Sequence, residues 1–140
     1  MLKEHGYRLI VISNQSGIGR GYFRAQDVEC LHEYMNRILQ RQNAAVDAFY
    51  YCHHVEQDMC GCRKPRTGLI DRAAAEWGID LSCSYMVGDT ETDVMTAIHS
   101  GCRYGLVLSG HAVPEMVRQK YKAHLYQNLW DFARRICEVE

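Results

Sequence analysis

Residues 52–62, with the sequence CHHVEQDMCGC, contain the side chains best suited to bind a metal ion. Sulfur and nitrogen ligands at C-x-H-x5-C-x-C spacing match the tetrahedral coordination that zinc prefers. Isolated cysteines are often small buried hydrophobic residues, but four candidate ligands in so short a segment favour zinc. Because protein atoms would fill all four positions, we expect a structural site rather than a catalytic one. The expected ligands are Cys52, His54, Cys60 and Cys62, with His53 as the alternative to His54.

Three places in the sequence, each directly after an expected strand or after the expected zinc loop, carry polar groups suited to bind a phosphate. Segment 13–21 (SNQSGIGRG) offers a hydroxyl, an amide and a glycine-rich turn whose N–H groups can bind an anion, although such turns also serve as plain connections. Lys64 is a compact positive charge suited to a phosphoryl oxygen, although a single lysine is usually a surface residue. Asp89 and Asp93 could together face one Mg2+. Alternatively, Asp89 could cap a helix.

The length of 140 residues and the 47% of hydrophobic residues are typical of one globular domain, spanning residues 1–140. A net charge of -1 and the absence of a basic run argue against nucleic-acid binding. No apolar stretch is long enough to span a membrane, and the first residues lack the apolar region of a signal peptide. Seven cysteines, an odd number, without an export signal indicate reduced thiols. We therefore expect a cytoplasmic protein, and a monomer.

Short apolar runs alternate with segments of helical periodicity along the chain. Segment 7–13 is a continuous apolar run typical of a strand buried on both faces, and segment 26–42 has apolar residues at helical spacing. Gly78 and Gly101 mark expected helix ends. The repeated strand–helix order predicts an α/β fold, with a Rossmann-like parallel sheet and helices on both faces. The expected strands are 7–13, 46–51, 84–87, 103–108 and 123–126, and the expected helices are 26–42, 68–77, 93–100, 113–120 and 129–137.

Three segments, in this order, resemble motifs of the haloacid dehalogenase (HAD) superfamily of phosphotransferases. Segment 11–21 (VISNQSGIGRG) resembles the second motif, and segment 62–65 (CRKP) resembles the third. Segment 85–89 (YMVGD), together with Asp93, resembles the fourth. The NQSGIGRG turn and the zinc loop narrow the resemblance to the branch that contains heptose bisphosphate phosphatases and histidinol-phosphate phosphatases.

The resemblance implies a Mg2+-dependent phosphatase that positions a phosphoryl group and stabilises its charge. It gives catalytic roles to Ser13, which would hydrogen-bond the phosphoryl group, and to Lys64, which would neutralise its charge. Asn14 and Arg63 would bind the substrate, a phosphorylated sugar or histidinol phosphate, and Asp89 would bind magnesium. The second implied cofactor is a structural Zn2+ that shapes the substrate loop, with the ligands Cys52, His54, Cys60 and Cys62.

The chain departs from the family pattern at the nucleophile. The family uses an aspartate of a D-x-D motif at the end of a first strand, and no D-x-D occurs in these 140 residues. Because aspartyl-phosphate chemistry needs that carboxylate, we expect this chain by itself to be inactive while still able to bind phosphate and metal. A smaller departure is Thr90, where the branch often carries a basic residue.

The family's first strand lies between the strands that end at Ser13 and Asp89. Without that neighbour, these two strands would have unpaired backbone groups or would pair with each other. We therefore expect the chain to be marginally stable, or the natural protein to be longer.

More than one function remains open at this point. The favoured substrate is D-glycero-D-manno-heptose 1,7-bisphosphate. Histidinol phosphate is the alternative, because the five residues between His54 and Cys60 make a short loop. A non-catalytic phosphate-binding module is a second class of protein. A zinc-stabilised interaction domain, in which Lys64 and Asp89 are merely structural, is the least favoured.

Overall fold

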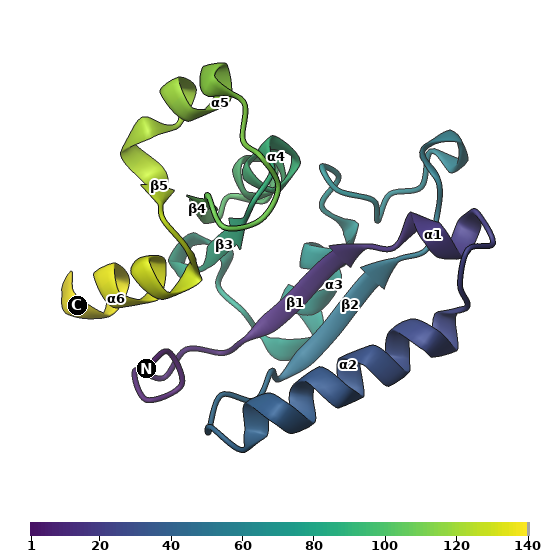
Figure 1. Cartoon of the computed structure of the whole chain (residues 1–140), viewed down its shortest axis with the longest axis horizontal. Coiled ribbons are helices and arrows are strands. Elements are labelled where there is room, and N and C mark those ends of the chain that lie inside the picture. Colours follow the sequence, from purple (N-terminus) through teal and green to yellow (C-terminus); the bar gives the residue numbers. More distant parts are fainter. Residues whose placement is uncertain (140) are drawn as a thin grey trace.

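The computed structural model describes residues 1–139, in which strands and helices alternate along the chain (Figure 1). This arrangement confirms the predicted α/β class. The strands are β1 (Ile10–Asn14), β2 (Ala48–Cys52), β3 (Tyr85–Gly88), β4 (Arg103–Val107) and β5 (Leu125–Tyr126). The helices are α1 (Ser16–Gly19), α2 (Ala25–Gln40), α3 (Gly68–Trp77), α4 (Glu91–Ser100), α5 (Glu115–Lys120) and α6 (Leu129–Val139). Short 3-10 helices are η1 (Glu56–Asp58), η2 (Leu81–Cys83) and η3 (Lys122–His124).

Strands β1 and β2 pair in parallel, with Ile10 opposite Ala48, and carry a helix on each face. Successive side chains of a strand point to opposite faces of its sheet. On one face of β2, the His32 ring of α2 stacks on Phe49 with 4.5 Å between ring centroids. On the other face, side chains of β2 and α3 form an apolar cluster of buried residues: Tyr50, Cys52, Leu69 and Ala73.

Strands β3, β4 and β5 form a second parallel sheet, in that order. Leu106 of β4 is fully buried and packs with Val94 of α4. Phe132 of α6 meets Tyr126 of β5 edge to face, with 5.0 Å between ring centroids. Helices therefore also cover this sheet, which positions the end of β3 firmly.

The strands lie in two sheets, because β1 and β3 do not pair with each other among residues 1–139. The carbonyl of Leu9 and the N–H of Gln15 form hydrogen bonds toward the β2 side of β1. Backbone groups of successive residues in a strand point to alternate edges, so the N–H and carbonyl of Ile12 point to the edge of β1 away from β2. The carbonyl of Ile12 accepts a hydrogen bond from the Lys64 side chain at that edge. Of the two outcomes expected for these strands, the structure thus has the one in which they stay apart.

Local chemistry explains most of the element boundaries. Helices α3 and α4 end, as predicted, at Gly78 and Gly101, which have φ values of 62° and 78° that favour glycine. Helix α4 begins after Thr90, whose hydroxyl accepts from the N–H of Asp93. The helix cap is therefore Thr90, and the alternative interpretation that Asp89 caps this helix is wrong. The short helix α1 lies within the segment that we expected to be a glycine-rich turn.

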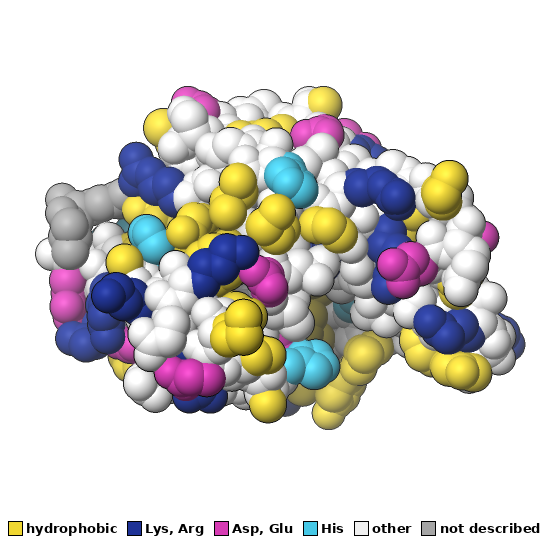
Figure 2. All heavy atoms as spheres, turned by 90° about the horizontal axis from the view of Figure 1, so that it is seen from above, with side chains coloured by type: hydrophobic (Ala, Val, Ile, Leu, Met, Phe, Trp, Pro, Cys, Tyr) yellow, Lys and Arg dark blue, Asp and Glu magenta, His cyan; other side chains and the backbone are white. Residues whose placement is uncertain are grey.

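Charge is mixed on the face seen from above in Figure 2, where Lys and Arg side chains are interspersed with Asp and Glu. Charges of one sign therefore do not dominate that face. In the part of the chain that the structure describes, none of the helices combines the length and the apolar character needed to cross a membrane.

Candidate functional site

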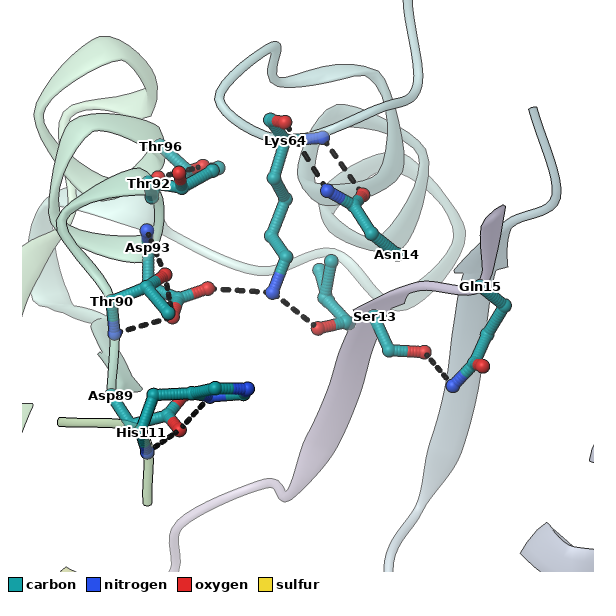
Figure 3. Close-up of polar contacts among 11 residues, drawn as sticks. Ser13, Asn14, Gln15, Lys64, Asp89, Thr90, Thr92, Asp93, Thr96 and His111 are labelled. Atoms are coloured by element: carbon teal, nitrogen blue, oxygen red, sulfur yellow. Dashed lines mark hydrogen bonds and ion pairs between the residues drawn. The ribbon is translucent and has the colours of Figure 1, made fainter. Parts of the chain in front are cut away.

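Lys64 lies between the ends of β1 and β3, where it joins the two halves of the molecule (Figure 3). Its ammonium group donates to Oδ1 of Asp93 at 2.6 Å and to the carbonyl oxygen of Ile12 at 3.1 Å. Only 13% of the Lys64 side chain and 6% of the Asp93 side chain are exposed. The ion pair is therefore shielded from water, which strengthens its Coulomb attraction. The result is a positive charge fixed beside the end of β1.

Asn14, at the end of β1, holds the backbone of Lys64 in place. Its side-chain amide donates to the carbonyl of Lys64 at 3.2 Å, and its oxygen accepts from the Lys64 N–H at 3.0 Å. In the structure Asn14 thus positions the backbone of Lys64. The contact with substrate that the resemblance implied stays a prediction. The neighbouring Ser13 hydroxyl accepts a 3.4 Å hydrogen bond from the Gln15 amide and keeps its own proton to donate.

The Asp93 carboxylate forms hydrogen bonds at the start of α4 and an ion pair with Lys64. Its Oδ2 accepts from the hydroxyl of Thr90 at 2.7 Å and from the N–H of Thr90 at 3.1 Å, which completes a reciprocal capping box. A Cβ atom at Gly88 would clash with the Asp93 carboxylate, which explains the glycine before Asp89. Asp93 and Asp89 therefore have separate hydrogen-bond partners in this structure. Their joint binding of one Mg2+ stays a prediction.

Asp89 follows β3 and carries the carboxylate expected to bind magnesium. Its Oδ2 accepts from the N–H of His111 at 2.7 Å and from the ring Nδ1 of His111 at 2.6 Å (Figure 3). Burial acts to raise the pKa of Asp89, but the hydrogen bonds from His111 outweigh it and hold this pKa below its usual value. The carboxylate is therefore ionised at neutral pH, as a magnesium ligand must be.

His111 is a residue that sequence reasoning missed. It lies on the loop after β4, at the edge of the sheet where ligands of parallel α/β proteins bind. Its position three residues after the end of the predicted strand 103–108 was the available signal.

Arg63 presents a buried donor that lacks a partner. Its Nη1 atom is buried and has no hydrogen-bond partner among the described residues. An unsatisfied buried donor costs about 1–3 kcal/mol, a cost that an anionic oxygen would remove. The nearby Arg66 instead donates to the carbonyl of Cys60 at 2.7 Å. Arg63 thus has the chemistry of a group that binds an anion.

The four expected zinc ligands converge beside this site, with all ligand atoms within 4.8 Å of one another. Sulfur atoms lie 3.2–3.5 Å apart, and Nδ1 of His54 lies 3.3 and 3.6 Å from two of them. Sulfur atoms on a tetrahedral zinc lie about 3.8 Å apart, given Zn–S bonds of about 2.3 Å. His53, the alternative ligand, has its ring centroid 4.0 Å from that of His54, with the two rings tilted by 33°, and is outside the cluster. The donor set therefore fits zinc.

Protons are shared unequally within this cluster. Burial acts to raise the pKa of Cys60, but hydrogen bonds from Cys62 and Cys52 lower it to about 7. Burial and hydrogen bonds to the same two neighbours raise the pKa of Cys62 to about 12. A proton therefore leaves Cys60 more readily than Cys62, and a zinc ion would displace the thiol protons.

Known proteins similar to this chain are HAD-type phosphatases. A family model described as HAD-hydrolase-like matches residues 61–132. The chain is 40% identical over 108 residues to the D-glycero-beta-D-manno-heptose-1,7-bisphosphate 7-phosphatase of Helicobacter pylori strain J99, a match covering 76% of this chain and 62% of that protein. It is 29% identical to the protein of the same name from Neisseria meningitidis strain Z2491, covering 98% of this chain and 75% of that protein.

A solved structure of high similarity matches nearly the whole chain. It is D,D-heptose 1,7-bisphosphate phosphatase from B. bronchiseptica, complexed with magnesium and phosphate. The TM-score is 0.86 at 28% sequence identity, and the match covers 99% of this chain and 79% of that one. The two sheets thus have the relative placement found in that phosphatase, although this chain spans only 62% of the Helicobacter pylori relative.

Proposed function

Because the chain belongs to the HAD-hydrolase-like family, we propose that it is a Mg2+-dependent phosphatase of a sugar bisphosphate. The proposed substrate is D-glycero-D-manno-heptose 1,7-bisphosphate, and we place the protein in the cytoplasm as a monomer. The observation that carries the proposal is the convergence of Ser13, Lys64 and Asp89 at the ends of β1 and β3 (Figure 3). The relatives named for that substrate support the choice of sugar.

Each of these residues has a distinct task in the proposed reaction. The Ser13 hydroxyl donates a hydrogen bond to a phosphoryl oxygen, and the fixed ammonium of Lys64 neutralises its charge. Asp89 holds Mg2+, which when bound supplies further charge neutralisation at the phosphoryl oxygens. The unpaired Nη1 of Arg63 bonds an oxygen of the substrate. Asn14 keeps Lys64 in place through both atoms of its amide group.

We do not propose turnover by this sequence alone, because it lacks the family's nucleophile. Aspartyl-phosphate chemistry needs a D-x-D carboxylate, and these 140 residues contain none. Binding of phosphate and metal without turnover therefore stays our prediction for the isolated chain.

We also propose that Cys52, His54, Cys60 and Cys62 hold a structural Zn2+. The site would tie the end of β2 to the loop that carries Arg63 and Lys64. Four protein ligands leave no open position, so zinc would shape the substrate loop and take no part in the reaction.

Binding and turnover test the proposal separately. In isothermal titration calorimetry, we expect the zinc-loaded chain to bind D-glycero-D-manno-heptose 1,7-bisphosphate when Mg2+ is present. The variant Asp89→Asn should lose the magnesium dependence, because it lacks the charged ligand. A chain that binds neither this sugar nor inorganic phosphate would contradict the proposal. Release of phosphate by the isolated chain would support a phosphatase but overturn our prediction of inactivity.

Histidinol phosphate is the second candidate substrate, and the short loop of five residues between His54 and Cys60 favours it. The same calorimetric titration with histidinol phosphate separates the two candidates. Tighter binding of histidinol phosphate than of the heptose bisphosphate would replace the proposed substrate while leaving the phosphate site intact.

A further inference from the structure

His111 contacts the carboxylate of Asp89 with two donors at once. The backbone N–H lies 2.7 Å from Oδ2, and the ring Nδ1 lies 2.6 Å from the same oxygen. An ionised carboxylate only accepts hydrogen bonds, so the proton of this contact is on Nδ1. The ring is otherwise open to solvent, since 81% of the His111 side chain is exposed. The contact with Asp89 is therefore the main one that orients the ring.

The loop after β4 is built to reach Asp89. Strand β4 pairs with β3 so that Leu106 lies opposite Gly88, and the loop beyond β4 contacts Asp89, the residue after β3, through Gly110 and His111. A Cβ atom at Gly110 would clash with Oδ2 of Asp89, so only glycine permits this approach. The close approach brings the backbone N–H of His111 onto the carboxylate.

We propose that His111 is a positioning residue of the magnesium site: it holds Oδ2 of Asp89 and thereby turns Oδ1 toward the cation. This inference rests on the proposed function, because it takes Asp89 as the magnesium ligand. Residues that hydrogen-bond a metal ligand fix its orientation, and their loss costs about 10–100-fold in metal affinity. The magnesium site thus extends from the end of β3 to the loop after β4.

Competition is the alternative to positioning, and it predicts a change of the metal affinity in the opposite direction. If His111 competed with the cation for Asp89, its removal would raise the metal affinity. A measurement of metal affinity therefore decides between positioning and competition.

Mn2+ is a suitable probe, because free and bound Mn2+ differ in their electron paramagnetic resonance signal. The chain is first saturated with Zn2+, so that the thiolates are occupied, and Mn2+ is titrated in the presence of inorganic phosphate. We expect His111→Ala to weaken Mn2+ binding by about 10–100-fold. His111→Asn should recover most of the affinity, because its amide nitrogen can occupy nearly the position of Nδ1. Mg2+ should displace the bound Mn2+ in every variant.

Two controls make the outcomes distinct. Asp89→Asn should abolish Mn2+ binding, and its failure to do so would contradict the proposed function itself. His5→Ala removes another exposed histidine, whose ring bonds the carbonyl of Met1, and should leave the affinity unchanged. Since the His111 ring is exposed, the thermal midpoint of His111→Ala should match that of the parent chain. Unchanged or tighter Mn2+ binding by His111→Ala, with Asp89→Asn still inactive in binding, would overturn the positioning role alone.

Discussion

The side chains at the strand ends are already paired with one another before any ligand binds. Lys64 holds Asp93, Asn14 holds the backbone of Lys64, and His111 holds Asp89. Groups fixed in this way would need little reorganisation to receive the proposed phosphate, and electrostatic stabilisation is most effective when the stabilising groups are already in place. Arg63 differs from them, because its buried Nη1 lacks a partner.

At the cysteine cluster, a single substitution tests whether the four ligands act together. The variant Cys60→Ser replaces a thiolate by a hydroxyl, a much poorer zinc ligand. We expect the parent chain to bind one Zn2+ and to gain several degrees in thermal midpoint, and Cys60→Ser to lose most of that gain. Cys30→Ser is the matched control, since Cys30 is exposed and outside the cluster. An equal zinc-dependent gain in both variants would contradict the site.

At the scale of single elements, the start of α4 and the pairing of β1 with β2 are each fixed by one polar side chain. Thr90 caps α4 and also bonds Asp93, so it stabilises the helix and orients the partner of Lys64. Asp47, just before β2, accepts from the N–H of Leu9, just before β1, at 2.6 Å. This contact helps to set the register of the first sheet.

Removal of the helix cap should have a modest, measurable cost. We expect Thr90→Ala to lower the free energy of unfolding by about 1 kcal/mol, because one hydrogen bond to the first turn is lost. Thr90→Ser keeps the hydroxyl and should change it by only a few tenths. Urea unfolding of the two variants checks this. Equal stability of the alanine and serine variants would show that the capping box contributes nothing.

Asp47 should contribute stability that depends on pH. Burial acts to raise its pKa, but hydrogen bonds from Lys3 and the Leu9 N–H hold this pKa below the usual value of an aspartate. A group with a lowered folded pKa stabilises the protein above its unfolded pKa and loses this effect as pH falls through the folded value. We therefore expect Asp47→Asn to be less stable than the parent by about 1 kcal/mol at pH 7.

The difference between the Asp47 variant and its parent should shrink below about pH 4, where the parent carboxylate takes up a proton. Urea unfolding of both proteins at pH 7 and pH 3 provides the comparison. A stability difference that is the same at both values would exclude a charge-dependent role.

At the scale of the whole molecule, Lys64 is one of the residues that link the two sheets. Its ammonium group bonds both the backbone of β1 and the carboxylate of Asp93 in α4. It thus connects the two sheets although β1 and β3 do not pair with each other among residues 1–139. The same ammonium group is the expected phosphate ligand. If Lys64 binds phosphate as proposed, stability and phosphate binding depend on one side chain.

A double-mutant comparison can separate these two roles. Lys64→Met should lower the free energy of unfolding by about 3–5 kcal/mol, because Asp93 is left buried without its counter-charge. Adding Asp93→Asn should restore much of that stability, since the uncompensated charge is gone, but should not restore phosphate binding. Urea unfolding and calorimetry with inorganic phosphate measure the two properties. Phosphate affinity equal to that of the parent in the double variant would exclude Lys64 as a ligand.

The amino-acid sequence by itself determined the features that depend on short-range spacing. The four candidate zinc ligands fall within residues 52–62, so a compact loop can bring them together, and in the structure their ligand atoms do converge. Hydrophobic periodicity likewise predicted the order of strands and helices, including the ends of α3 and α4 at glycines. These features need no information about distant parts of the chain.

Only the tertiary structure decided how the polar groups at the strand ends pair. Asp89 meets His111 across 22 residues, Lys64 meets Asp93 across 29, and Asn14 meets Lys64 across 50. Such contacts depend on strand register and on which face a helix covers, and residue types alone do not specify them. The same holds for the separation of β1 from β3, because a strand's own sequence does not say which neighbour will satisfy its backbone groups.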